Sequence, residues 1–269
     1  MNFTAQFRTK KCGNGIFAIT TPMNEQVYLV CGKERALLID TGMGIGSLKA
    51  VVDSLADLPV TVVNTHGHPD HAGGNMEFSE VWLHPDDNEI YKKMCSKDYR
   101  TANVRKIMGR SAPEYENVIL PFMPATRNLL ENQEFELGGR TLKTFQCPGH
   151  SKGSIMIYDS QTKSLFTGDS VAATEIWLFL KTSEPLETYY HALESFNKMG
   201  LDISLLYPGH LPSPVESTML ENMSSCVGNV LFRGEKGEPF ETFAGIGLKY
   251  EYKEAKIIYD PDKLYGVIR

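Results

Sequence analysis

Four side chains that bind transition metals occur within six residues of this sequence. They belong to His66-Gly67-His68-Pro69-Asp70-His71. Imidazole nitrogens and carboxylate oxygens are ligands that Zn, Fe(II) and Mn(II) accept in proteins. A small residue and a proline between them allow a loop to curl so that alternate side chains converge. The sequence therefore predicts a metal-binding loop at this position.

Three more metal-type side chains, His150, Asp169 and His210, stand directly after a glycine. Each also follows a short segment that reads as a strand. A lone residue of this kind after a glycine is usually a turn residue or a helix cap. Three of them in the same context, beside the first cluster, favour a shared site. More ligands than the first four are needed because four cannot fill two coordination spheres and leave positions for water.

Short apolar segments predict the strands that carry these residues. The first are Gly15 to Thr20, Gln26 to Cys31, Ala36 to Ile39 and Val60 to Asn64, whose end delivers His66. Further strands are expected at Val81 to Leu83, Thr141 to Gln146, Ser154 to Tyr158, Ser164 to Thr167 and Leu205 to Tyr207. The loop thus follows a buried strand, and each later candidate also stands at a strand end.

Helical spacing follows Ser47, a candidate N-cap, and recurs over Pro185 to Met199 and Ser213 to Val230. Residues 85–130 are rich in Met, Tyr and charge, and we expect a helical cover there. Phe240 to Tyr250 with Ala255 to Tyr259 predicts a closing β-hairpin over about 240–260. No linker separates these elements, so we expect residues 1–269 to form a single domain.

The composition narrows the class of protein. The 269 residues carry a net charge of −6 and are 42% hydrophobic, which excludes disordered and collagenous chains and argues against nucleic acid as a partner. No apolar run is long enough to cross a membrane, and no leader segment is visible. The 5 cysteines form no CxxC pair, so we expect free thiols and a cytoplasmic protein.

In chain order the sequence has five motifs: Asp40 after the strand Ala36 to Ile39, the loop His66 to His71, His150, Asp169 and His210. Together they resemble the metallo-β-lactamase superfamily of hydrolases in its seven-ligand, dinuclear form, with a ligand set similar to those of glyoxalase II and the lactonases. The resemblance runs from the strand before Asp40 to His210, in the family's order. It implies an α/β fold, α+β in some schemes: a four-layer αβ/βα sandwich with the metals at one edge and a helical cover segment.

The resemblance also implies a role for each residue. His66, His68 and His150 would hold one metal. The other would be held by Asp70, His71 and His210, with Asp169 bridging the two. Asp40 matches an aspartate that accepts hydrogen bonds and orients the metal loop.

The implied activity is that of a dinuclear metal-dependent hydrolase. A hydroxide bridging two divalent ions, with Zn favoured and Fe or Mn also suited, would attack a small ester, thioester or lactone. Asp70 is the candidate catalytic residue, since a carboxylate there can orient the hydroxide and pass its proton to the leaving group. True β-lactamases commonly carry Cys or Ser where Asp169 stands, and acyl-homoserine lactonases carry Tyr where Ser170 stands, which disfavours both specific substrates.

Two other functions stay open at this point. One is a mononuclear-iron oxidoreductase resembling the persulfide dioxygenases, which would use only His66, His150 and Asp169. The other is a noncatalytic ligand sensor on the same fold. Each would have a small-molecule ligand, but the sequence assigns no substrate-binding residue and no oligomeric state.

Overall fold

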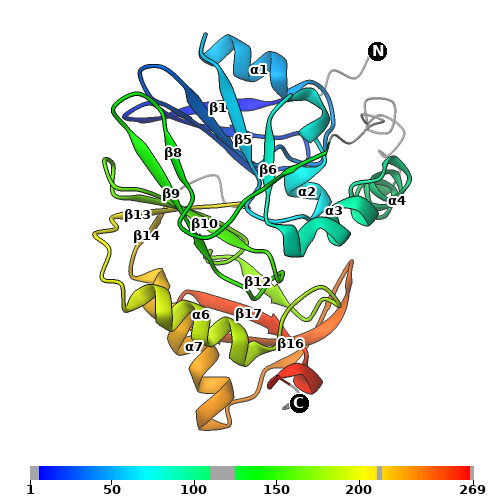
Figure 1. The fold of residues 1–269 in the computed structure, drawn as a ribbon. Helices are drawn as coiled ribbons and strands as arrows, with labels where there is room; N and C mark the ends of the chain where they lie inside the picture. The colour runs from blue at the N-terminus through cyan, green and yellow to red at the C-terminus, as the bar shows by residue number, and fades with distance from the viewer. Residues whose placement is uncertain (1–5, 110–124, 211–213, 267–269) are drawn as a thin grey trace. The chain divides into compact units, whose positions relative to one another are not determined.

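The computed structural model describes residues 6–109, 125–210 and 214–266 (Figure 1). The chain divides into two compact units, residues 1–143 and 144–269. The expectation of a single domain stays a prediction, and each unit is described by itself. Within the described ranges no helix combines the length and apolar character needed to cross a membrane.

The first unit is built on a seven-stranded sheet with the strand order β1-β2-β3-β4-β5-β6-β7. The first four strands pair antiparallel, and β4 to β7 pair parallel. Their bounds are β1 Arg8–Gly13, β2 Ile16–Thr20, β3 Gln26–Cys31, β4 Ala36–Ile39, β5 Val60–Val63, β6 Val81–Leu83 and β7 Arg127–Asn128.

The parallel pair β4 and β5 brings the first two motifs together. Both strands are short apolar runs, and Ile39 lies opposite Val63 in their register. Since the carboxyl ends of parallel strands meet at the same edge of a sheet, the residues after each strand emerge side by side. Asp40 therefore emerges beside the segment that begins at Asn64 and leads into the metal loop.

Helix α1 Leu48–Leu55 covers this sheet and begins as the sequence predicts. The Ser47 hydroxyl accepts a 3.2 Å hydrogen bond from the Ala50 N–H. The Glu77 carboxylate accepts another from the Leu48 N–H at 2.7 Å. Leu48 and Val52 are buried against the strands, so the apolar face of the helix and its N-cap both follow the sequence pattern.

The metal loop itself leads into the short helix α2 Pro69–Ala72. Helices α3 Asn88–Met94 and α4 Lys97–Met108 follow within the segment expected to be a helical cover, whose residues 110–124 lie outside the described residues. The 3₁₀ turns η1 Asn75–Glu77 and η2 Pro85–Asp87 separate these elements. The Cys95 thiol lies 3.6 Å from the Gly67 carbonyl, so α3 packs directly on the loop.

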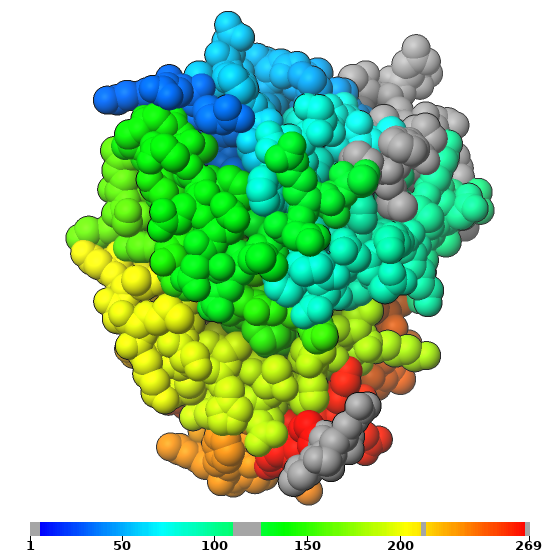
Figure 2. Space-filling model, viewed as in Figure 1, coloured from blue at the N-terminus to red at the C-terminus, as the bar shows by residue number. Residues whose placement is uncertain are grey.

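Strand β8 Glu134–Glu136 pairs antiparallel with β9 Thr141–Gln146, which runs across the boundary between the two units. β8 alternates between exposed and half-buried residues, and its green segment lies at the surface in Figure 2. The hairpin leads the chain to the third motif.

The second unit contains two groups of strands. One has the order β14-β13-β11-β10 and the other β12-β17-β16-β15. Helices α6 Leu186–Asn197 and α7 Met219–Arg233 pack on its core, which contains Met156, Leu165, Tyr189 and Val227. The strand bounds are β10 Ile155–Asp159, β11 Ser164–Gly168, β12 Glu175–Leu178, β13 Leu205–Pro208, β14 Val215–Glu216, β15 Glu238–Thr242, β16 Gly245–Tyr252 and β17 Ala255–Tyr259.

A second parallel pair, β11 and β13, positions the last two motifs. Gly168 lies opposite Pro208 in the register. The Gly209 N–H donates to the Gly168 carbonyl at 2.9 Å. Asp169 and His210 each follow one of these glycines and therefore leave the sheet at the same edge.

Several elements differ from the sequence predictions. The helix expected over 213–230 begins only at Met219, because Val215–Glu216 pairs with β13 as strand β14. Its first expected residue, Ser213, lies outside the described residues. The strand expected over 240–250 is divided by a turn, and Gly245 has a φ of 147° there. Strand β1 was not anticipated.

We predict that Gly73→Ala destabilises the first unit. A Cβ at Gly73 would lie 2.4 Å from the Pro69 carbonyl oxygen and 2.6 Å from that of Met43, and neither backbone atom can rotate away. Overpacking of this kind costs about 1–3 kcal/mol. Urea unfolding measures the effect. Gly266→Ala is the matched control, since a Cβ there would meet nothing within 4 Å, and equal stability of the two variants would contradict the packing argument.

Candidate metal centre

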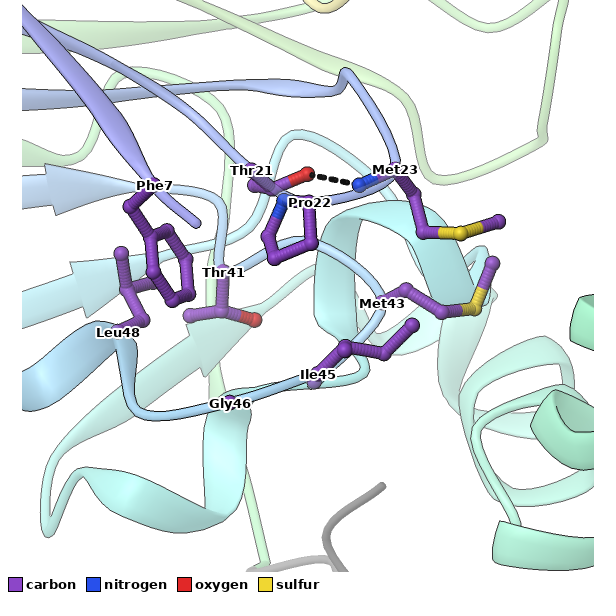
Figure 3. Close-up of a pocket in the computed structure, with 10 residues that line it drawn as sticks. Phe7, Thr21, Pro22, Met23, Thr41, Met43, Ile45, Gly46 and Leu48 are labelled. Atoms are coloured by element: carbon purple, nitrogen blue, oxygen red, sulfur yellow. Dashed lines mark hydrogen bonds between the residues drawn. The ribbon is translucent and has the colours of Figure 1, made fainter. Parts of the chain in front are cut away.

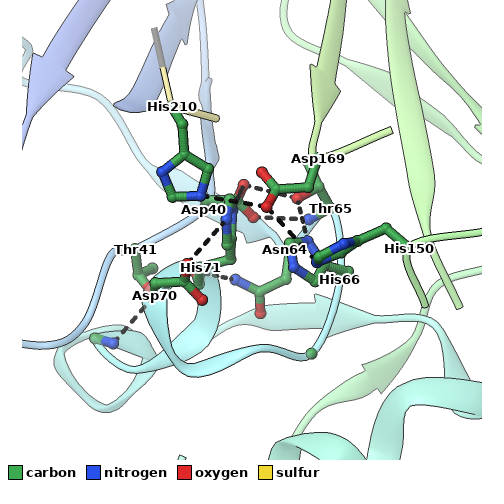
Figure 4. A network of polar contacts seen from close by, with 12 residues as sticks. Asp40, Thr41, Asn64, Thr65, His66, Asp70, His71, His150, Asp169 and His210 are labelled. Carbon is green, nitrogen blue, oxygen red and sulfur yellow. Dashed lines mark hydrogen bonds and ion pairs between the residues drawn. The ribbon is translucent and has the colours of Figure 1, made fainter. Parts of the chain in front are cut away.

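A buried carboxylate organises the metal loop from behind. The Asp40 Oδ1 accepts a hydrogen bond from the Thr65 N–H at 2.7 Å, and Oδ2 accepts one from the Thr65 hydroxyl at 2.7 Å. The same Oδ2 lies 2.8 Å from the His71 Nδ1 (Figure 4). Three donors thus satisfy a carboxylate that is only 2% exposed, as a buried charge requires. The structure thus places Asp40 behind the loop, and its role in orienting metal ligands stays a prediction.

These contacts fix the protons on two imidazoles. A carboxylate can only accept, so His71 carries its proton on Nδ1 and directs the Nε2 lone pair away from Asp40. The single Thr65 hydroxyl proton goes to Asp40, so the 3.1 Å contact between the Thr65 Oγ1 and the His66 Nδ1 needs a proton on that nitrogen. Both rings therefore offer Nε2, the atom that a metal would take.

The backbone of the loop is held by residues that the sequence did not single out. The Gly67 N–H donates to the fully buried Asp87 carboxylate at 2.8 Å. The His71 carbonyl accepts from the Thr41 N–H at 2.7 Å and from the Asn64 amide at 3.1 Å. A strand-end position was the only available signal for Thr65 and Asn64. No pattern in the sequence distinguishes Asp87 from a surface turn aspartate.

Two loop residues lie at the start of α2. His68 is the N-cap residue of this helix, and Asp70 lies in its first turn. The Asp70 Oδ2 is 3.7 Å from the His71 Nε2, and the Asp70 side chain is 29% exposed. Asp70 thus lies close to the His71 Nε2 and is also accessible to solvent. A residue that contacts a substrate needs this access.

The second unit assembles its three candidates around one carboxylate oxygen. The Asp169 Oδ2 is 3.2 Å from the His210 Nε2 and 3.6 Å from the His150 Nε2. The His150 Nδ1 donates to the Trp177 carbonyl at 2.8 Å, and since a carbonyl only accepts, this ring also offers Nε2. One carboxylate oxygen therefore faces the Nε2 atoms of two histidines.

Local packing explains the position of His150. A Cβ on the preceding Gly149 would lie 2.3 Å from the Tyr189 ring, so only glycine allows this approach. The Ser183 hydroxyl lies 3.0 Å from the His150 carbonyl, and the Lys263 ammonium donates to the Ser183 carbonyl. Tyr189 of α6 thus packs on the loop at Gly149, and Ser183, itself contacted by Lys263, holds the His150 carbonyl.

The donor chemistry of both clusters fits divalent metals. All seven candidate ligands offer nitrogen or a carboxylate oxygen, the set that Zn, Fe and Mn accept. His66, His71 and His150 each donate Nδ1–H to an oxygen acceptor, as histidines that ligate metals usually do. The donor atoms and the histidine contacts described within each unit thus suit the binding of divalent metal ions.

The other two histidines of the sequence, a buried cysteine and a buried tyrosine near the second cluster have structural contacts. The His84 Nδ1 accepts from the Asp86 N–H at 3.3 Å, and the ring of His191 contacts that of Tyr190 on α6. Burial raises the pKa of the Cys147 thiol to about 12, so no thiolate is available there near neutral pH. Tyr189 is a fully buried core residue that donates to the Ser170 carbonyl.

A shallow hollow, open to solvent, lies in the first unit beside the turn that follows β4 (Figure 3). Its lining is mainly apolar and includes Met23, Met43 and Ile45. The Thr41 side chain also lines it, and its hydroxyl lies 3.1 Å from the His71 carbonyl. Thr41 thus both lines this hollow and contacts the backbone of the metal loop.

Comparison with known proteins agrees with this architecture. Residues 20–210 match the metallo-beta-lactamase superfamily. Among solved structures, a metallo-beta-lactamase from Pontibacter korlensis aligns with a TM-score of 0.62 and 19% identity, covering 83% of this chain and 100% of the other. The archaeal superfamily protein ST1585 from Sulfolobus tokodaii aligns with a TM-score of 0.58 and 22% identity, covering 79% and 86%.

The chain belongs to the metallo-β-lactamase superfamily, and the α/β fold that its motifs implied is confirmed. Among its relatives is acyl-coenzyme A thioesterase MBLAC2 of Gallus gallus, 33% identical over 226 residues that cover 76% of this chain and 80% of the relative. The Homo sapiens protein of that name is 29% identical over 224 residues, covering 75% and 80%. These relatives support the prediction of a hydrolase.

Proposed function

We propose that this protein hydrolyses small acyl thioesters with two divalent metal ions. The observation that carries the proposal is the similarity to acyl-coenzyme A thioesterases over most of both chains. The site chemistry agrees with it, since the chain has Asp169 where true β-lactamases commonly carry Cys or Ser. Among the ester, thioester and lactone substrates that the sequence left open, the relatives favour the thioester.

Seven residues would hold the metals, with zinc the favoured ion and iron or manganese also suited by the donors. His66, His68 and His150 would hold one ion, and Asp70, His71 and His210 the other, with Asp169 shared. The contacts of the Asp169 Oδ2 with the Nε2 atoms of both His150 and His210 support its role as the shared ligand. When bound, the two ions lower the pKa of water and stabilise negative charge on an oxyanion.

The residues of the chain supply the positioning and the proton transfer. Asp40 and Thr65 hold the protons of His66 and His71 on Nδ1, so that their Nε2 atoms stay free of protons. The partly exposed Asp70 carboxylate accepts a proton from the attacking water and returns it to the leaving thiolate. The attack breaks the carbon–sulfur bond and releases a carboxylic acid and a thiol.

We expect the metal-loaded protein to contain two metals per chain and to release free thiol from short acyl-coenzyme A substrates. A thiol-detecting dye measures turnover, and elemental analysis measures the metal. Prolonged chelation should abolish turnover, and one added divalent ion should restore it. The panel should include an ester, a lactone and a persulfide. Oxygen uptake with the persulfide would favour the oxidoreductase, and tight binding without turnover of any substrate would favour a ligand sensor.

We predict that Asp70→Asn lowers kcat by about 10²–10⁴, the usual contribution of a positioned general base. The metal at His66, His68 and His150 should remain, because Asp70 is not among its proposed ligands. Turnover and metal content are measured on the same preparation. Asp53→Asn is the control, since Asp53 is an exposed residue of α1 that pairs with Lys49. Equal losses of metal content and turnover would mean that Asp70 acts only as a metal ligand and not as a general base.

A further inference from the structure

The contacts of Thr65 join two histidines that the proposed function places at different metals. His71 reaches the Asp40 Oδ2 directly, at 2.8 Å. His66 reaches the same oxygen through the Thr65 hydroxyl, by contacts of 3.1 Å and 2.7 Å. One carboxylate oxygen therefore lies at the end of both paths. The whole set is buried in the first unit.

We propose that Thr65 is a positioning residue that links the Asp40 carboxylate to His66 through its hydroxyl. One buried carboxylate then orients a proposed ligand of each metal, His71 directly and His66 through Thr65. The inference rests on the proposed assignment of His66 and His71 to different metals. The Thr65 hydroxyl makes this link because it contacts both groups, 3.1 Å from the His66 Nδ1 and 2.7 Å from the Asp40 Oδ2. It accepts a hydrogen bond from the His66 Nδ1–H and donates one to the Asp40 carboxylate.

The two metal positions should respond differently to loss of this hydroxyl. Without it, the His66 Nδ1–H contact is lost, and the proton can move to Nε2, the atom needed for the metal. His71 keeps its own contact with the Asp40 Oδ2, and Asp40 keeps the Thr65 N–H. The Thr65 effect should therefore be confined to the metal that His66 binds.

The test compares Thr65→Val, which keeps the branched shape, with Thr65→Ser, which keeps the hydroxyl. Chelator competition gives a dissociation constant for each metal, and His68→Ala and His210→Ala identify which constant belongs to which position. We expect Thr65→Val to weaken the His66 position by about 10–100-fold, as loss of a residue that supports a ligand does. The other position should change several-fold less, and Thr65→Ser should restore wild-type binding.

A second readout uses the metal-free protein. Long-range ¹H–¹⁵N spectra of the imidazoles distinguish the Nδ1–H from the Nε2–H form. We expect the wild type and Thr65→Ser to show Nδ1–H at both His66 and His71, and Thr65→Val to show mixed forms at His66 alone. An unchanged His66 signal in Thr65→Val, or an equal loss of affinity at both metal positions, would overturn the proposal. Absence of metal from the wild type would contradict the proposed function instead, and the spectra would still decide the role of Thr65.

Discussion

The metal loop depends on the buried charge of Asp40. A carboxylate that is almost fully removed from water is costly unless donors surround it, and its three donors come from Thr65 and His71. The backbone at Asp40 has a φ of 65°, a conformation that an aspartate tolerates better than most residues. The parallel register of β4 and β5 brings Asp40 to Thr65, and Gly73 and Gly74 let the returning chain lie against Thr41 and Met43.

The second unit uses the same arrangement. β11 and β13 are parallel, as β4 and β5 are, and in each pair an aspartate follows one strand and a histidine follows the other. The aspartates differ in their contacts. Asp40 lies behind its loop and accepts hydrogen bonds from His71 and Thr65, whereas Asp169 faces the Nε2 atoms of His150 and His210. Equivalent positions at strand ends thus support the loop in one unit and carry a proposed metal ligand in the other.

Much of this arrangement could be predicted from the sequence because its signals are local. β3 and β4 have the expected limits and α1 has the expected start, since apolar runs bounded by turn residues define the strands and Ser47 defines the start of the helix. β1 was missed because Arg8–Gly13 is a polar, mostly exposed edge strand that owes its conformation to pairing with β2. The start of α7 was placed too early because strand β14 is defined by its pairing with β13.

In the candidate site, too, only part of the arrangement could be predicted from the sequence. Metal-type residues are recognisable from their side chains and their glycine neighbours, but their supports are not. Thr65, Asp87 and the Trp177 carbonyl are ordinary groups whose role depends on a partner that is distant in the sequence. The Trp177 contact with His150 spans 27 residues and uses a backbone atom, so no residue type could have indicated it.

The central claim is that His and Asp side chains, each presented by its supports, hold two metals. The most direct measurement is anomalous diffraction from crystals of the metal-loaded protein, recorded on both sides of the metal absorption edge. The account predicts two peaks, one ligated by His68 and by the Nε2 atoms of His66 and His150, and the other by Asp70, His71 and His210, with Asp169 between them. A single peak, or ligation through the Nδ1 of His66 or His71, would contradict it.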